Sequence, residues 1–263
     1  MVLFLFLTHL GLGIAFSLLV VDREPGVKFF RFSAGVAAGL LFLALTLMPD
    51  EAASGPAAST AFHALAVATV ALGFYWLTVG RVLRPARLVA LPLAAAAGVV
   101  ALVGHALWLS AAAPAWQALT ILSVLSSTAL LGGSCTALVL GHWYLVVPSL
   151  DVSHLQSMVK LHFVSTVIRI LVVGVVVWLA IVTTQPGMGA AFARYVTSVA
   201  GIFFWQRVLF GLVGPLVLAY LTWETAKIRS TQSATGILYV DFFTVIVGEV
   251  LSKYLLLSTS VPL

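Results

Sequence analysis

The sequence has little charge. Of its 263 residues only 8% are Asp, Glu, Lys or Arg, whereas 62% are hydrophobic. A soluble domain carries roughly 25% charged residues, so no soluble core could absorb this much apolar surface. The apolar runs are continuous and do not alternate, which excludes a β-barrel. Because backbone groups in lipid must be satisfied internally, the sequence predicts an all-α, polytopic membrane helix bundle.

Cysteine is nearly absent as well. The one cysteine, Cys135, lies inside an apolar run. The chain therefore has no disulfide framework, no Cys-x-x-Cys-His haem attachment and no Cys-ligated iron–sulfur cluster of its own. Any such centre must belong to a partner subunit. The net charge of +5 does not indicate nucleic acid, because the basic residues lie in short loops and are better interpreted as topology signals.

Long loops are also missing. No stretch between apolar runs exceeds roughly a dozen residues, and no glycine-rich phosphate motif follows a strand. A chemical reaction in water would therefore need another subunit. We expect residues 1–263 to form a single integral membrane domain that is non-catalytic or reacts only with quinone.

The apolar runs predict about eight membrane spans. The first is followed by Asp22, Arg23 and Glu24 and lacks a positive leading segment, so we expect a retained helix and not a cleaved signal. Proline, glycine and short polar runs separate the spans. The predicted spans cover residues 2–21, 29–48, 60–80, 88–110, 116–147, 157–184, 194–223 and 233–257.

The basic residues divide unequally between the two ends of these spans. One face holds only Arg194 and, near the end of the last helix, Lys253. By the positive-inside rule both chain termini face away from the cytoplasm, in the cytoplasmic (inner) membrane of a bacterium. The residues on the other, cytoplasmic face are Arg23, Lys28, Arg31, Arg81, Arg84, Arg87, Lys160, Lys227 and Arg229.

Four histidines fall at two depths on four consecutive spans. His63 and His105 lie near the outer side, and His142 and His162 near the inner side. The helix rise separates the two levels by roughly 15 to 20 Å. Two imidazoles at one height can ligate haem, and two stacked bis-histidine haems form an electron path across a membrane. The pattern predicts two b-type haems.

Other interpretations of the histidines stay open. Each one is also explained by a hydrogen bond to a neighbouring helix or by a place at the polar interface. His9 in the first span could join His63 and His105 in a three-histidine metal site. His154 lies in a predicted cytoplasmic loop, where we expect it to be solvated.

Charged side chains also occur deep inside spans, which makes them candidates for function. Arg169 and Arg207 each need a carboxylate, a haem propionate or a quinone oxygen as partner. The internal carboxylates are Asp241 and Glu249. Glu249 can pair with Lys253 four residues later, whereas Asp241 has no such local partner. Asp241 could take up the proton of a quinone reaction or form an ion pair with an arginine.

Eight spans, both termini outside and a last span reading Val247-Gly248-Glu249-Val250-Leu251-Ser252-Lys253 resemble the membrane-anchor subunit of dimethyl sulfoxide and polysulfide reductases. The resemblance implies roles for Gly248, Glu249 and Lys253 in a subunit that anchors iron–sulfur and molybdenum proteins and exchanges electrons with quinone, commonly without haem. The four histidines depart from that pattern and resemble dihaem cytochrome b subunits.

The sequence thus predicts a dihaem cytochrome b-like electron-transfer subunit of a respiratory or photosynthetic complex. It would be linked to quinone and lipid, with an iron–sulfur or cytochrome c subunit as partner. Arg169 and Arg207 would neutralise propionates or orient quinone, and Asp241 or Glu249 would handle protons. The alternatives are a haem-free quinone-binding anchor and a transporter or structural assembly subunit.

Overall fold

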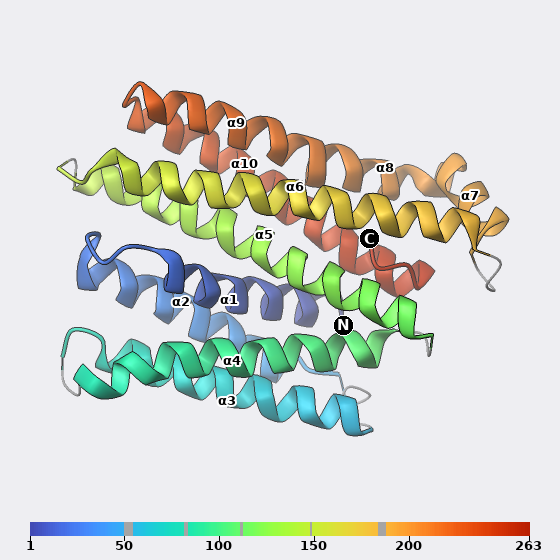
Figure 1. Ribbon diagram of the computed structural model, residues 1–263, viewed down its shortest axis with the longest axis horizontal. Helices are drawn as coiled ribbons and strands as arrows, with labels where there is room; N and C mark the ends of the chain where they lie inside the picture. The colour runs from blue at the N-terminus through green and yellow to red at the C-terminus, as the bar shows by residue number, and fades with distance from the viewer. Residues whose placement is uncertain (50–54, 82–83, 111–112, 148, 184–187) are drawn as a thin grey trace.

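A computed structural model describes residues 1–49, 55–81, 84–110, 113–147, 149–183 and 188–263, without the side chains of 84–87. These residues contain helices and no strand (Figure 1). The elements are α1 (Val2–Val20), α2 (Gly26–Thr46), α3 (Pro56–Thr78), α4 (Arg84–Leu109), α5 (Pro114–Val146), α6 (Val152–Val182), α7 (Ala190–Thr197), η2 (Val199–Gly201), α8 (Ile202–Val208), η3 (Leu209–Val213), α9 (Gly214–Lys227) and α10 (Thr231–Thr259).

Eight segments of the described chain are long and apolar enough to cross a membrane. They coincide, within a few residues at each end, with the eight spans expected from the sequence. The predicted all-α bundle is therefore confirmed, and the chain is a multi-pass membrane protein. The breaks at residues 50–51, at Pro148 and at 185–187 lie outside the described residues.

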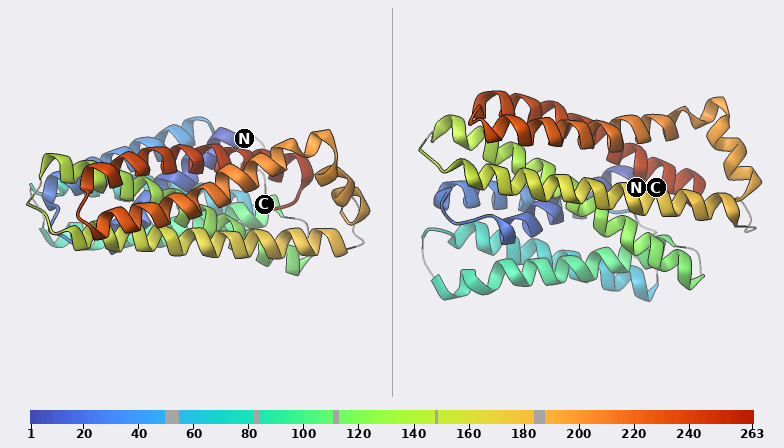
Figure 2. Two further views of the ribbon diagram at one scale, coloured as in Figure 1. Left: turned by 90° about the horizontal axis from the view of Figure 1, so that it is seen from above. Right: turned by 45° about the horizontal axis from the view of Figure 1, so that its top comes forward.

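The centre of the bundle is α5, which runs obliquely between α1 to α4 on one side and α6, α9 and α10 on the other (Figures 1 and 2). It packs against α1, α4, α6 and α10. With 33 residues it is about 50 Å long, so it must tilt or project from a hydrocarbon core of about 30 Å. Its backbone meets α1 where Gly13 faces Gly132, since a Cβ on Gly132 would lie 2.0 Å from the Gly13 carbonyl carbon.

The loop before α6 is fixed by a helix cap. Asp151 accepts a hydrogen bond from the Ser153 N–H at 2.9 Å, which satisfies one of the free donors of the first turn. The same bond lowers the pKa of the exposed Asp151 carboxyl. In the same loop the Tyr144 hydroxyl donates to the main-chain oxygen of Asp151. The turn between α5 and α6 is thereby held at both ends.

The seventh span departs from one continuous predicted helix. Residues 190–197 form the separate helix α7, and the spanning segment from 199 to 227 contains the π-helical turn η3 between α8 and α9. Pro215 lies in the first turn of α9, directly after η3. A proline has no N–H to donate to the preceding turn, and π-turns occur mostly as local insertions near functional residues. Arg207, a charged residue, lies in α8 two residues before this π-turn.

Candidate functional site

The buried face of α10 carries polar residues along most of its length. Asp241, Thr244, Glu249, Ser252 and Lys253 are all buried, and they follow one another at spacings of three, five, three and one. Residues three, four, seven or eight apart lie on one side of a helix. This side of α10 faces α5 and α9 and places a column of polar groups inside the bundle.

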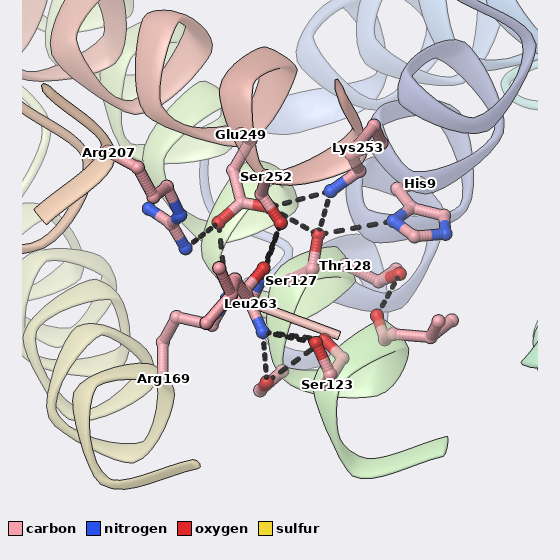
Figure 3. Close-up of polar contacts among 12 residues, drawn as sticks. His9, Ser123, Ser127, Thr128, Arg169, Arg207, Glu249, Ser252, Lys253 and Leu263 are labelled. Carbon is pink, nitrogen blue, oxygen red and sulfur yellow. Dashed lines mark hydrogen bonds and ion pairs between the residues drawn. The ribbon is translucent and has the colours of Figure 1, made fainter. Parts of the chain in front are cut away.

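Glu249 is the centre of one cluster in this column, which we call the Glu249 cluster (Figure 3). Its Oε1 accepts from Arg207 Nη2 at 2.8 Å and from Arg169 Nε at 3.2 Å. Its Oε2 accepts from Ser127 Oγ at 2.5 Å and from Lys253 Nζ at 2.6 Å. The carboxylate is completely buried, so these four donors replace its hydration.

Arg169 fastens α6 to this cluster. Its Nη1 donates to the main-chain oxygen and hydroxyl of Ser123, at 3.0 and 2.7 Å, and lies 3.3 Å from the hydroxyl of Ser126. Its Nη2 donates to Ser252 Oγ at 3.0 Å and to the main-chain oxygen of Leu263 at 2.8 Å. Every guanidinium nitrogen thus has an acceptor, and one side chain ties α5, α6 and α10 together.

Ser127 connects Lys253 to His9 of α1. Its hydroxyl donates to Glu249, accepts from Lys253 Nζ, and lies 3.1 Å from His9 Nδ1. A hydroxyl has one donor and two acceptor positions, so His9 Nδ1 must carry the hydrogen and donate to it. His9 Nε2 has no hydrogen-bond partner among the described residues. A cavity of about 10 Å³ beside these side chains has room for a single water.

Arg207 is held less completely than Arg169. It is fully buried and bonds only Glu249, and its Nε and Nη1 have no hydrogen-bond partner in the described part of the chain. Glycines make space for its guanidinium. A Cβ on Gly211 would lie 2.2 Å from Arg207 Nη1, and one on Gly248 would lie 2.1 Å from the Cα of Gly211. The glycine of the Gly248-Glu249 pair therefore serves close packing against the π-turn.

The Glu249 cluster contains three basic side chains and one carboxylate. Arg169 and Arg207 stay protonated in proteins, whereas a lysine can lose its proton when it is buried. Lys253 is therefore the one cation of the three that can relieve the excess positive charge by giving up a proton. Its Nζ contacts both Glu249 and Ser127, and Ser127 leads on to His9.

A second centre, the His162–Asp241 pair, lies nearer the other end of the bundle. His162 Nε2 and Asp241 Oδ2 are 2.8 Å apart, and both side chains are completely buried. Neither atom has a well-directed hydrogen bond, and His162 Nδ1 and Asp241 Oδ1 also have no partner among the described residues. Buried polar atoms are rarely left unsatisfied, so this pair differs from Glu249, whose two carboxylate oxygens each accept two bonds.

The outer pair of predicted haem ligands does not face a common space. His63 is exposed, and its Nδ1 donates to the main-chain oxygen of Ser59 in its own helix at 2.7 Å. His105 is buried, with its ring edge against Phe4 at 5.2 Å between centroids. One side chain points out of the bundle and the other points into it.

The inner pair is separated in the same way. His142 is exposed and lies 3.3 Å from the Tyr239 hydroxyl, whereas His162 is buried against Asp241. Bis-histidine haem needs two imidazoles that face each other across a gap. Neither predicted pair has this arrangement, so the described side chains do not fit haem. Haem binding stays a prediction.

The structure does not bring His9, His63 and His105 together as a metal site. Over the described residues, no group of three or more His, Cys, Asp or Glu side chains is placed to hold a metal ion. His9 instead bonds Ser127, and His63 is exposed. His154, expected to be solvated, contacts Glu24 in the neighbouring loop.

Sequence reasoning found the charges of the site and missed its hydroxyls. The ion pair of Glu249 with Lys253 matches the spacing of four residues. The sequence analysis predicts no role for the hydroxyls of α5, namely those of Ser123, Ser126 and Ser127. A run of hydroxyl residues inside an apolar span is the signal that indicates such a role. Comparisons with models of known protein families and with curated proteins found no match.

Proposed function

We propose that this chain is a haem-free, proton-exchanging membrane subunit of a quinone-linked oxidoreductase complex. The observation that carries the proposal is the fully buried contact between His162 and Asp241. Ionisable groups inside a membrane protein are costly, and they are therefore candidates for proton relays. Two titratable groups in contact, with unsatisfied atoms on both, can accept or release a proton without rearranging the helices.

The proton would move between two centres along one seam of the bundle. Asp241 and Glu249 are eight residues apart on α10, which is about 12 Å along the helix. His162 and Arg169 are similarly separated on α6. The buried hydroxyls of Thr166 and Thr244 lie at intermediate heights on the same two helices. Beyond Glu249, the contacts from Lys253 through Ser127 to His9 extend the seam to α1.

The two centres would have different tasks. Glu249 is held ionised by three basic side chains, so it supplies a fixed negative charge and does not exchange its proton. In the described part of the chain, the one ionisable side chain that Asp241 contacts in an ion pair is His162, so we propose that the charge of Asp241 can change. We therefore assign proton exchange to His162 and Asp241, with Lys253 as the exchanging group of the Glu249 cluster.

The link to quinone rests on the resemblance of Gly248, Glu249 and Lys253 to reductase anchor subunits and on the short loops, which leave redox chemistry to a partner or to the bilayer. The cavity beside Arg169 holds about one water, which is too little for a quinone ring. Any quinone would bind elsewhere on the chain and deliver its protons to the seam.

A proton-coupled transporter is the second candidate. The interrupted seventh span favours it, because transporters often use broken helices beside a charged site near the middle of the membrane. The π-turn η3 directly follows α8, whose Arg207 reaches Glu249.

Infrared difference spectroscopy separates these functions. Protein in lipid films with added quinone is measured before and after electrochemical reduction of the quinone. We expect a change in the absorption of a protonated carboxyl that is lost in Asp241→Asn and kept in Asp22→Asn, a variant of an exposed loop carboxylate.

A carboxyl that exchanges its proton with deuterated water but ignores quinone reduction would favour the transporter. A chain in which no carboxyl exchanges would contradict proton exchange altogether. A b-type haem spectrum of the purified protein that is lost in His142→Ala would restore the dihaem hypothesis.

A further inference from the structure

A groove on the outside of the bundle lies between α2 and α3. It has a volume of about 530 Å³ and is lined by Lys28, Arg31, Phe32, Gly35, Val36 and Trp76. The two basic residues lie in the first two turns of α2, three residues apart, and so share one side of the helix. The remaining lining residues are apolar or aromatic.

Gly35 gives the groove its shape. A Cβ at this position would lie 2.7 Å from Trp76 Nε1 and 3.0 Å from Trp76 Cδ1. Only glycine therefore lets the indole of α3 lie across α2 at this point. The indole, 42% exposed, forms one wall, and Phe32 and Val36, 54% and 38% exposed, line the side of α2.

The two cations of the groove have no partner among the residues that the structure describes. Neither Lys28 nor Arg31 has an ion pair or a hydrogen bond from its side chain to another residue of the described ranges. By contrast, the basic residues of the Glu249 cluster are all satisfied at least in part by a carboxylate. An uncompensated pair of cations beside an apolar wall favours an anionic ligand.

The groove is graded from charged to apolar along the helix axis. Lys28 is the third residue of α2, where the chain enters the span, and Val36 lies about 12 Å further along the helix. The two cations therefore lie nearer the start of the span and Val36 lies deeper in it, an order that matches the headgroup and the acyl chain of a phospholipid.

We propose that this groove binds one anionic phospholipid, its phosphate between Lys28 and Arg31 and an acyl chain along Phe32, Val36 and Trp76. Basic recesses between spanning helices at the basic end of a membrane protein are typical sites for acidic headgroups. A free phosphate would use the two cations but not the apolar wall, so the two ligands can be told apart.

The test uses lipids with brominated acyl chains, which quench tryptophan fluorescence on contact. The purified protein is reconstituted in zwitterionic phosphatidylcholine and titrated with brominated phosphatidylglycerol or, in parallel, brominated phosphatidylcholine. We expect half-maximal quenching at a mole fraction of phosphatidylglycerol at least tenfold lower. Because the chain has seven tryptophans, Trp76→Phe identifies the signal of the groove and should remove the selective component.

Charge variants show which residues select the lipid. A basic residue near the headgroups contributes about fivefold to binding of an acidic lipid, so Lys28→Gln with Arg31→Gln together should remove the preference for phosphatidylglycerol. Lys28→Arg should preserve it. The matched control is Lys160→Gln, which removes an exposed charge of α6 from the same end of the bundle.

Equal quenching by the two lipids in the unaltered protein would overturn the proposal, and so would a preference that survives the double substitution. A loss of preference in Lys160→Gln as large as in the double variant would show general surface attraction and not a site. If inorganic phosphate alone abolished the preferential quenching by brominated phosphatidylglycerol, the two cations would be assigned to a free anion. The readout is independent of proton exchange, so it stands or fails separately from the proposed function.

Discussion

The two buried charged centres differ in how completely they are satisfied. In the Glu249 cluster both carboxylate oxygens accept two bonds each, and Arg169 uses all of its nitrogens. In the His162–Asp241 pair one contact of 2.8 Å joins the two side chains, and both groups keep unpartnered atoms. Both centres include fully buried side chains of α6 and α10, so burial alone does not distinguish them.

The difference indicates that the two centres do different work. The Glu249 carboxylate accepts from donors on α5, α6, α8 and α10 and so fixes the relative positions of these helices, because moving one of them leaves a buried charge uncompensated. An unsaturated pair can exchange a proton at little structural cost. The comparison predicts that substitutions in the Glu249 cluster affect stability most and that substitutions of Asp241 affect proton exchange most.

The largest loss of stability is expected for Glu249→Gln. It leaves three buried basic side chains without their carboxylate, and breaking a buried ion pair in this way costs about 3–5 kcal/mol. Thermal unfolding of the purified protein in detergent measures the effect. Glu224→Gln removes an exposed carboxylate paired with Lys227 and should change stability by less than about 1 kcal/mol. Equal losses in the two variants would remove the special status of Glu249.

Arg169→Met should destabilise the protein more than Arg207→Met. Arg169 donates to buried oxygens of Ser123, Ser252 and Leu263, and each of these residues would lose one donor. Each buried group left unsatisfied costs about 1–3 kcal/mol. Among the described residues Arg207 bonds only Glu249, and Glu249 Oε1 would keep its bond from Arg169. Melting temperatures in one detergent compare the variants, and a reversed order would mean that Arg207 has partners outside this chain.

Gly248→Ala should cost an intermediate amount, about 1–3 kcal/mol, because the added methyl group would lie 2.1 Å from the Cα of Gly211 and force α10 away from the π-turn. Gly236→Ala is the control on the same helix, since a methyl group there would meet nothing. The same melting assay tests both. An unchanged Gly248→Ala would show that α10 and the π-turn separate freely.

The smallest effect on stability is expected for Asp241→Asn. The amide has nearly the same shape and keeps a polar contact to the His162 imidazole, so stability should change by about 1 kcal/mol or less. Thermal unfolding of Asp241→Asn and Glu249→Gln under the same conditions compares the two losses of stability. A loss as large as that of Glu249→Gln would mean that the His162–Asp241 pair is a structural ion pair.

The sequence was sufficient to predict the number and approximate limits of the spans, because hydrophobic length is a local property. The pairing of Glu249 with Lys253 was equally local. The contact of Asp241 with His162 was not predicted, although each is the eleventh residue of a helix that begins at the same end of the bundle, α10 and α6 respectively. Counting depth from helix ends could have brought them together.

The pairing of histidines depended on a property that depth does not determine, the rotation of each helix about its axis. Ala61 of α3 packs against Gly104 of α4, so a Cβ on Gly104 would lie 2.8 Å from that of Ala61. His63 is two residues beyond Ala61, which is about 200° around the helix, and so it points away from α4. A helix that is apolar on all sides gives no sequence signal for this rotation, so the direction in which a single histidine points cannot be predicted from it.

The most direct test of proton exchange at the His162–Asp241 pair is infrared spectroscopy of the protein in lipid during transfer between ordinary and deuterated water at changing pH. We predict a buried carboxyl whose absorption shifts in deuterated water, in the unaltered protein and in Glu224→Gln, and is absent in Asp241→Asn. A signal that persists in Asp241→Asn would contradict the assignment of proton exchange to this pair.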